Sequence, residues 1–175
     1  MNKFCIHIYC GDGKGKSTAA MGLALRAAGS GERVLVTQFL KDGTSSELKI
    51  LRKLPGVQVL TCSQQFGFFW NMTEEQKAKA RCAYGELFRE TVQIAVREKF
   101  FLLIMDELIA AYNHDLLDRE EVLKFLREKP EGLEIVLTGR DPAPELVELA
   151  DYVSEIQKRK HPFDQGLPAR KGIEL

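Results

Sequence analysis

The chain has 175 residues, enough for one domain with a sizeable core, and 45% of them are apolar. Its 25 Lys and Arg residues balance its 25 Asp and Glu residues, and zero net charge gives no support for binding nucleic acid or a membrane surface. No apolar run could cross a bilayer, no signal peptide precedes the first strand pattern, and the four cysteines have no C-x-x-C spacing. We therefore expect a cytoplasmic protein with one domain, residues 1–175.

Strand patterns alternate with helix patterns along the whole chain. Strands are predicted at 3–10, 33–40, 57–62, 100–105, 134–137 and 152–156, and helices at 18–28, 45–54, 73–99, 118–127 and from 141. A capping box from Thr73 to Gln76 starts the longest helix, and Asp118 and Asp141 are predicted caps for two later ones. This order predicts an α/β fold of the P-loop (RecA-like) kind, a mostly parallel sheet of about six strands with helices on both faces. An irregular tail is expected from about residue 157.

A glycine-rich segment joins the first strand to the first helix. It reads Gly11-Asp12-Gly13-Lys14-Gly15-Lys16-Ser17-Thr18. Backbone N–H groups that converge at a helix start bind anions, which indicates a phosphate-binding P-loop rather than a tight turn without phosphate. Lys16 would neutralise phosphate oxygens, and the Ser17 hydroxyl would bind Mg²⁺. The usual pattern has a glycine where this chain has Cys10, so the loop departs from it.

Polar residues follow two other strands. Asp106 and Glu107 end the apolar run from Phe101, and Arg140 follows the strand that ends near Thr138. The carboxyl ends of parallel strands meet at one edge of a sheet. One of the two carboxylates is therefore expected to bind Mg²⁺, with a strand-end cap as the alternative. Arg140 would clamp a phosphate or carboxylate, unless it forms a surface ion pair.

The segment between the third strand and the longest helix is unusually aromatic. It contains Phe66, Gly67, Phe68, Phe69 and Trp70, the last being the only tryptophan. Four aromatic side chains in a loop are not explained by helix or strand periodicity. They indicate a platform for a large flat ligand, or a hydrophobic plug over the core.

Taken together, these residues resemble the P-loop ATP:corrinoid adenosyltransferases, enzymes of cobalamin biosynthesis. The motifs that carry the resemblance occur in the family's order along nearly the whole chain: Gly11–Ala20, Gln38–Lys41, Gly67–Trp70, Met105–Leu108, Leu137–Arg140, Leu149–Asp151 and Lys160–Asp164. The non-glycine at Cys10 also resembles that family's form of the loop.

The resemblance implies an unusual use of ATP. Co(I) of the corrinoid substrate would attack the ribose 5′ carbon, and triphosphate would leave. The loop from Gly11 to Thr18, together with Arg140, would hold the nucleotide, with Lys16 as the main cation on the triphosphate. Ser17 and either Asp106 or Glu107 would hold Mg²⁺ or Mn²⁺.

The resemblance also assigns a role to the aromatic segment. Phe68 and Trp70 match the aromatics that lie under the corrinoid and exclude its lower axial ligand, while Phe69 between them is an extra aromatic. A dry, apolar face would favour four-coordinate cobalt and ease its reduction to Co(I). Lys16, Phe68 and Trp70 are therefore the expected catalytic residues.

The family further implies a homodimer and an electron donor such as a flavoprotein. Some members have a polar N-terminal extension that covers the active site, whereas this sequence begins at its first strand. We expect closure to be weaker, or to come from another segment such as the C-terminal tail.

Two other functions fit a P-loop with an Asp-Glu strand. One is a phosphotransferase such as a nucleoside kinase, although kinases of the thymidine kinase type usually have a C-x-x-C zinc site that is missing here. The other is a non-catalytic, ATP-dependent switch. Release of triphosphate rather than diphosphate would distinguish an adenosyltransferase from a kinase.

Overall fold

A single parallel sheet organises the molecule. The computed structural model describes residues 4–41, 43–64, 66–67 and 69–174. The sheet has the strand order β3-β2-β4-β5-β1-β6, and every neighbouring pair is parallel. Its strands are β1 (Ile6–Cys10), β2 (Val34–Gln38), β3 (Val57–Thr61), β4 (Leu102–Asp106), β5 (Glu134–Thr138) and β6 (Tyr152–Glu155). The predicted α/β class and the parallel sheet of six strands are confirmed.

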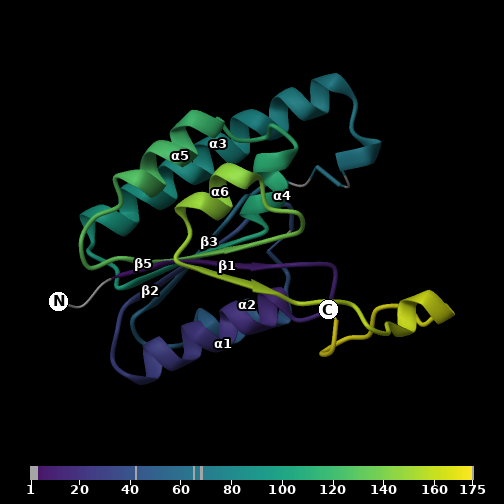
Figure 1. Cartoon of the computed structure of the whole chain (residues 1–175), viewed down its shortest axis with the longest axis horizontal. Helices are drawn as coiled ribbons and strands as arrows, with labels where there is room; N and C mark the ends of the chain where they lie inside the picture. Colours follow the sequence, from purple (N-terminus) through teal and green to yellow (C-terminus); the bar gives the residue numbers. More distant parts are fainter. Residues whose placement is uncertain (1–3, 42, 65, 68, 175) are drawn as a thin grey trace.

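Helices cover both faces of this sheet, as expected. Figure 1 shows α1 and α2 on one face, and α3, α4, α5 and α6 on the other. Their bounds are α1 (Lys16–Gly29), α2 (Ser46–Leu51), α3 (Glu74–Arg97), α4 (Leu108–Asn113), α5 (Arg119–Arg127) and α6 (Pro144–Leu149). Within the described residues, no helix is long and apolar enough to span a membrane.

Alternating side chains of the central strands fill two separate cores. In β4, Leu103 and Met105 pack with the α3 side, whereas Leu102 and Ile104 pack with α1 and α2. Because side chains alternate between the faces of a strand, a strand buried on both faces is apolar throughout. This explains why the run that leads to Asp106 has no polar residue before it.

The predicted caps of α3 and α5 are confirmed, but the predicted start of α6 is wrong. The Thr73 side chain accepts from the Gln76 amide, and the Gln76 side chain accepts from the Thr73 amide. Asp118 likewise accepts from Glu121 N.

Asp141, in contrast, caps no helix within the described residues. It lies in the left-handed region with φ of 49°, and α6 begins three residues later with Pro144 at its first turn and Ala143 at the N-cap. The rigid ring of Pro144 supplies the helix start that the sequence pattern attributed to Asp141 and Pro142.

A short helix after β4 was not predicted. Glu107, in the left-handed region with φ of 59°, turns the chain directly from β4 into α4. Only Asn113 of its six residues is polar, so α4 has no polar face from which its helical periodicity could be predicted.

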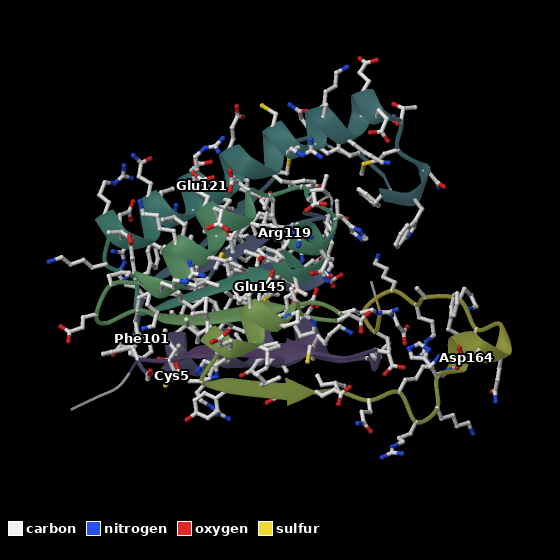
Figure 2. The ribbon with its side chains drawn as sticks, turned by 45° about the horizontal axis from the view of Figure 1, so that its top comes forward. Cys5, Phe101, Arg119, Glu121, Glu145 and Asp164 are labelled. Carbon is white, nitrogen blue, oxygen red and sulfur yellow. The ribbon has the colours of Figure 1, made fainter. Side chains whose placement is uncertain are left out.

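The carboxyl ends of all strands lie at one end of the molecule, to the right in Figure 1. The segment before α3 and the C-terminal tail with its 3₁₀ turn (Pro162–Gln165) extend from this same end. Figure 2 shows Asp164 of the tail at the opposite end of the molecule from Cys5 and Phe101, which lie near the amino ends of their strands. The parallel topology thus collects the candidate site residues at one edge.

Candidate functional site

The glycine-rich loop leads straight into α1. Gly15, the N-cap residue, has φ of 122°, a conformation that favours glycine, and no side chain caps the helix. The first N–H groups of a helix lack partners within it, so those at the start of α1 can bind an anion. Lys16 donates from Nζ to the Gly13 carbonyl at 2.9 Å, which keeps its ammonium folded over the loop. Its pKa is lowered by burial and by the nearby Arg140 guanidinium, so an anion here would be favoured.

The first half of the loop is bound to the chain that leaves β6. The Gly13 amide donates to the Ile156 carbonyl at 2.7 Å, and Asp12 Oδ1 accepts from the Lys158 amide at 2.9 Å. A Cβ on Gly11 or Gly13 would lie 2.5 or 2.6 Å from the Ile156 carbonyl oxygen. These contacts give both glycines a packing role, and they direct the Asp12 carboxylate to the tail.

A buried carboxylate lies next to the loop at the end of β4. Asp106 is fully buried and accepts from Thr138 Oγ1 at 2.7 Å, Gln38 Nε2 at 3.0 Å and Lys41 Nζ at 2.8 Å. Burial alone would raise the pKa of this carboxyl, but the Lys41 ammonium and the three hydrogen bonds hold it below its usual value. Asp106 is therefore ionised and links the ends of β2, β4 and β5.

The Glu107 side chain differs from that of Asp106 in its hydrogen bonding and in its access to a cavity. Its backbone amide donates to Thr138 Oγ1, while its carboxylate lines a cavity and has no hydrogen bond to the described residues. Burial and the charge of Asp106 raise its pKa, although Lys41, Lys16 and Arg140 oppose this. A partly buried carboxylate beside a fully buried one favours the arrival of a cation.

That cavity has a volume of about 640 Å³ and is lined by the loop, by the segment after β2 and by part of the aromatic segment. Its polar wall contains Lys14, Lys16, Ser17, Lys41 and Glu107. Its apolar wall contains Leu40, Phe66 and Tyr84, and the Phe66 and Tyr84 rings meet edge to face at 5.6 Å. Burial raises the pKa of Tyr84 to about 12, so its hydroxyl stays protonated. The cavity therefore joins an anion-binding wall to an apolar one.

The C-terminal tail returns to this cavity. Ile173 and Glu174 line it, and Glu174 Oε1 lies 3.5 Å from Lys14 Nζ. Glu174 also pairs with Arg170 at 3.0 Å, which is the main reason that its pKa falls to about 2. The expectation that the tail contributes to closure gains a specific contact, Lys14 with Glu174.

The aromatic segment divides into two parts. Phe66 enters the cavity wall, whereas Phe69 stacks on His114 with ring centroids 4.1 Å apart and an angle of 11°. Trp70 meets His114 edge to face at 4.9 Å and remains 78% exposed. Phe68 lies outside the described residues. Phe66 and Phe69 pack on the core, as the plug alternative expects, whereas Trp70 is left open and the platform stays a prediction.

Two members of this arrangement were not singled out from the sequence. Lys41 appeared there only as the end of a short motif, and His114 follows the helix that was not predicted. The position of Lys41 could have been inferred. Gln38 pairs with Asp106 between the parallel strands β2 and β4, so the residues that follow Gln38 lie at the same carboxyl edge of the sheet as Asp106. His114 had no such signal, because it reaches Phe69 only through the turn of α4.

Arg140 follows β5 at the same edge as the loop. Its guanidinium is exposed, and its charge affects the titration of Lys16, Asp12 and Glu107. No ion pair joins it to a carboxylate within the described ranges, so the surface ion pair considered above is not formed there. No cluster of three or more His, Cys, Asp or Glu residues suited to a metal occurs in the same ranges. Any metal here would need ligands from a nucleotide and water as well.

The parallel sheet, the glycine loop before α1 and the acidic end of β4 define a nucleotide-binding protein of the P-loop class. A family profile described as "ATP:corrinoid adenosyltransferase BtuR/CobO/CobP" matches residues 2–175. The chain belongs to this family, as the resemblance of its motifs predicted. It is therefore an enzyme, a transferase of cobalamin biosynthesis whose substrates are ATP and a corrinoid.

Curated relatives agree with this assignment. The chain is 34% identical to a corrinoid adenosyltransferase of Escherichia coli (strain K12), covering 97% of this chain and 84% of that one. It is 35% identical to a corrinoid adenosyltransferase of Pseudomonas aeruginosa, and the alignment covers 96% of this chain and 82% of that one. It is 32% identical to "Corrinoid adenosyltransferase CobA" of Salmonella typhimurium, with 97% of this chain and 84% of that one covered.

Among solved structures, the cytoplasmic domain of EssC aligns with a TM-score of 0.51 at 16% identity. The alignment covers 95% of this chain and 35% of the EssC chain. At this identity the likeness concerns the fold alone.

The packing of Gly13 against Ile156 predicts opposite effects for two glycine substitutions. Gly13→Ala places a methyl group 2.6 Å from a carbonyl oxygen and should lower the free energy of unfolding by about 1–3 kcal/mol. Gly22→Ala, inside α1 with no atom within 4 Å of the new Cβ, should raise it by about 0.5–1 kcal/mol. Urea denaturation of the ligand-free protein measures both. Equal stability of Gly13→Ala and wild type would show that the loop and tail move apart freely.

Proposed function

We propose that this enzyme transfers the 5′-deoxyadenosyl group of ATP to Co(I) of a corrinoid and releases triphosphate. The cobalt electron pair attacks C5′, the C5′–O bond breaks, and its electrons leave with the triphosphate. The observation that best supports this is the cavity itself, in which the P-loop and Lys16 face an apolar wall that includes Phe66 and Tyr84. Such a site can hold a triphosphate at one side and a large apolar ligand at the other.

In this proposal the loop holds a leaving group. Lys16, Arg140 and the amides at the start of α1 neutralise the charge that grows on the departing triphosphate. The protein needs no nucleophile of its own because the cobalt substrate is the nucleophile. Its contribution is to position C5′ toward the corrinoid and to stabilise the leaving charge.

The residues at the end of β4 fit a divalent metal. Ser17 Oγ and Asp106 Oδ2 both lie within hydrogen-bond distance of one ammonium group, that of Lys41, so this position already accommodates a cation between oxygen atoms. Hard oxygen ligands suit Mg²⁺ or Mn²⁺. We assign Ser17 and Glu107 as the direct ligands, since the Asp106 oxygens are engaged by three donors and Glu107 is not. The metal would supply Lewis-acid stabilisation to the triphosphate.

The aromatic segment is proposed to exclude the lower axial ligand of the corrinoid. Trp70 is the exposed ring of this segment. Its position is supported by an edge-to-face contact with His114, which in turn stacks on Phe69. Phe68 is retained in the proposal on the resemblance alone. An apolar face against cobalt lowers its coordination number and makes Co(II) easier to reduce.

A homodimer, an electron donor such as a flavoprotein and a cytoplasmic location complete the proposal, on the basis of the resemblance. The two other functions considered from the sequence, a nucleoside kinase and an ATP-dependent switch, are disfavoured by the family match along residues 2–175.

The proposal is tested by a single turnover with ATP and chemically reduced corrinoid. We expect an alkylcobalt absorbance spectrum and one triphosphate per adenosyl group transferred, because the C5′–O bond breaks rather than a phosphoanhydride. Chromatography of the phosphate products decides the point. Diphosphate without an alkylcobalt spectrum would indicate a phosphotransferase, and an unchanged spectrum with intact ATP a switch.

Trp70→Ala should slow Co(II) reduction on the enzyme by about ten- to a hundredfold and leave ATP affinity nearly unchanged. A large apolar side chain covered by a ligand contributes about 1.5–3 kcal/mol, which corresponds to that range. Stopped-flow reduction and calorimetric ATP titration separate the two effects. Tyr152→Ala is the control, since Tyr152 is an exposed aromatic at the amino end of β6. A wild-type reduction rate in Trp70→Ala would contradict the assigned role.

Glu107→Gln should weaken Mg²⁺-dependent ATP binding at least about tenfold, because it removes a charged metal ligand while keeping the shape of the side chain. ATP titrations at several Mg²⁺ concentrations measure this effect. Glu120→Gln, an exposed glutamate of α5, serves as the control. If Glu107→Gln binds Mg²⁺ and ATP like wild type, Asp106 rather than Glu107 is the metal ligand.

A further inference from the structure

One lysine lies where the proposed function requires a metal. Lys41 Nζ is 2.8 Å from Asp106 Oδ2 and 3.2 Å from Ser17 Oγ, and its charge also acts on Glu107. Ser17 is one of the two residues assigned to the metal, and Glu107, the other, follows Asp106 directly. The ammonium group therefore contacts one assigned ligand and lies next to the second.

Asp106 needs a cation whether or not a metal is bound. Its side chain is 0% exposed, and Thr138 and Gln38, its other partners, are neutral. A buried carboxylate without a counter-charge is strongly destabilising, and removing one partner of a buried pair leaves that cost uncompensated. Lys41 supplies this positive charge in the structure.

Of the side chains that contact Asp106, that of Lys41 is the least constrained by other contacts. Gln38 is held at its other end by Ser45, and Thr138 also accepts from the Glu107 amide. Lys41 instead follows β2 in a loop, after Leu40 at φ of 54°, and its side chain is 32% exposed at the cavity wall. A lysine ammonium on a flexible four-carbon stem can reach another partner without backbone movement.

We propose that Lys41 is a displaceable internal cation. It occupies the metal position in the nucleotide-free protein, and it turns into the cavity when the metal and the triphosphate bind. There it joins Lys16 as a second positive charge on the triphosphate. This inference rests on the metal site of the proposed function.

The exchange couples metal binding to triphosphate binding. A divalent ion and an ammonium group repel each other strongly when they share the same oxygens, so they compete for this position. Metal alone has to expel Lys41 into a cavity in which the carboxylates of Glu107 and Glu174 are already engaged, the first by the metal and the second by Arg170, so Lys41 needs a further anion. Triphosphate provides that anion, so the two ligands bind with positive cooperativity.

The test measures binding of Mn²⁺ alone, by electron paramagnetic resonance, without ATP or corrinoid. Lys41→Met should bind Mn²⁺ at least about tenfold more tightly than wild type, because the competing cation is gone. Added tripolyphosphate should tighten Mn²⁺ binding much more in wild type than in Lys41→Met. The control Lys49→Met, which removes an exposed lysine of α2, should behave like wild type. Equal or weaker Mn²⁺ affinity in Lys41→Met would overturn the proposal.

Thermal unfolding gives a second readout. Without metal, the Tm of Lys41→Met should fall by roughly 5–15 °C, since Asp106 loses its counter-charge, and millimolar MgCl₂ should restore most of that loss. The Tm of wild type should change little with MgCl₂ alone. A Tm loss in Lys41→Met that MgCl₂ does not restore would count against displacement by a metal.

Wild-type protein provides a readout that needs no variant, should Lys41→Met fail to fold. Reductive methylation followed by mass spectrometry should modify Lys41 several-fold faster when MgCl₂ is present, relative to Lys49 in the same sample. Unchanged labelling at saturating MgCl₂ would overturn the proposal. Because none of these experiments contains corrinoid, their failure would leave adenosyl transfer standing, and failure of the single-turnover assay would leave the metal results standing.

Discussion

The buried carboxylate of Asp106 is the interaction on which the rest of the site depends. It joins Gln38 at the end of β2, Thr138 at the end of β5 and Lys41 from the following loop. Three strand ends are thereby fixed to one charged atom group in a region with little water. Such networks are costly when a member is missing and rigid when all are present. The position of Glu107, one residue further, follows from this anchoring, because its amide is bound to Thr138 as well.

The two walls of the cavity are supported in different ways. The polar wall consists of backbone and lysine side chains of the glycine loop, which is fixed by β1, α1 and the chain that leaves β6. Phe66 of the apolar wall belongs to the connection between β3 and α3 and packs on Tyr84, while Phe69 of the same connection lies outside the cavity lining and stacks on His114. Changes on the aromatic side can therefore be accommodated without disturbing the glycine loop. Such a division suits the proposed reaction, which brings ATP and a large flat corrinoid together.

Most of the fold could be predicted from the sequence because its signals are local. The apolar runs, the capping box at Thr73 and the glycine loop each depend on neighbouring residues. The errors arose where distant contacts decide the outcome. Asp141 has the composition of a cap, yet Pro144 sets the start of α6, and α4 depends on the turn at Glu107. Likewise the loop and the Asp106-Glu107 pair were found, whereas Lys41 and His114 gain their importance only from partners brought near by β-strand pairing and by α4.

The close approach of Gly11 and Gly13 to the Ile156 carbonyl restricts which residues the loop can carry. Glycines in a loop of this kind are commonly explained by the bulk of a phosphate, yet here a peptide group from the far end of the chain excludes a side chain at both positions. The composition of the first loop is therefore partly dictated by the path of the last strand. In a homologous chain with another exit from β6, this clash would disappear at Gly13, whereas the φ of 99° at Gly11 would still disfavour any other residue. A residue other than glycine at the position of Gly13 would then indicate a different path of the C-terminal segment rather than a loss of activity.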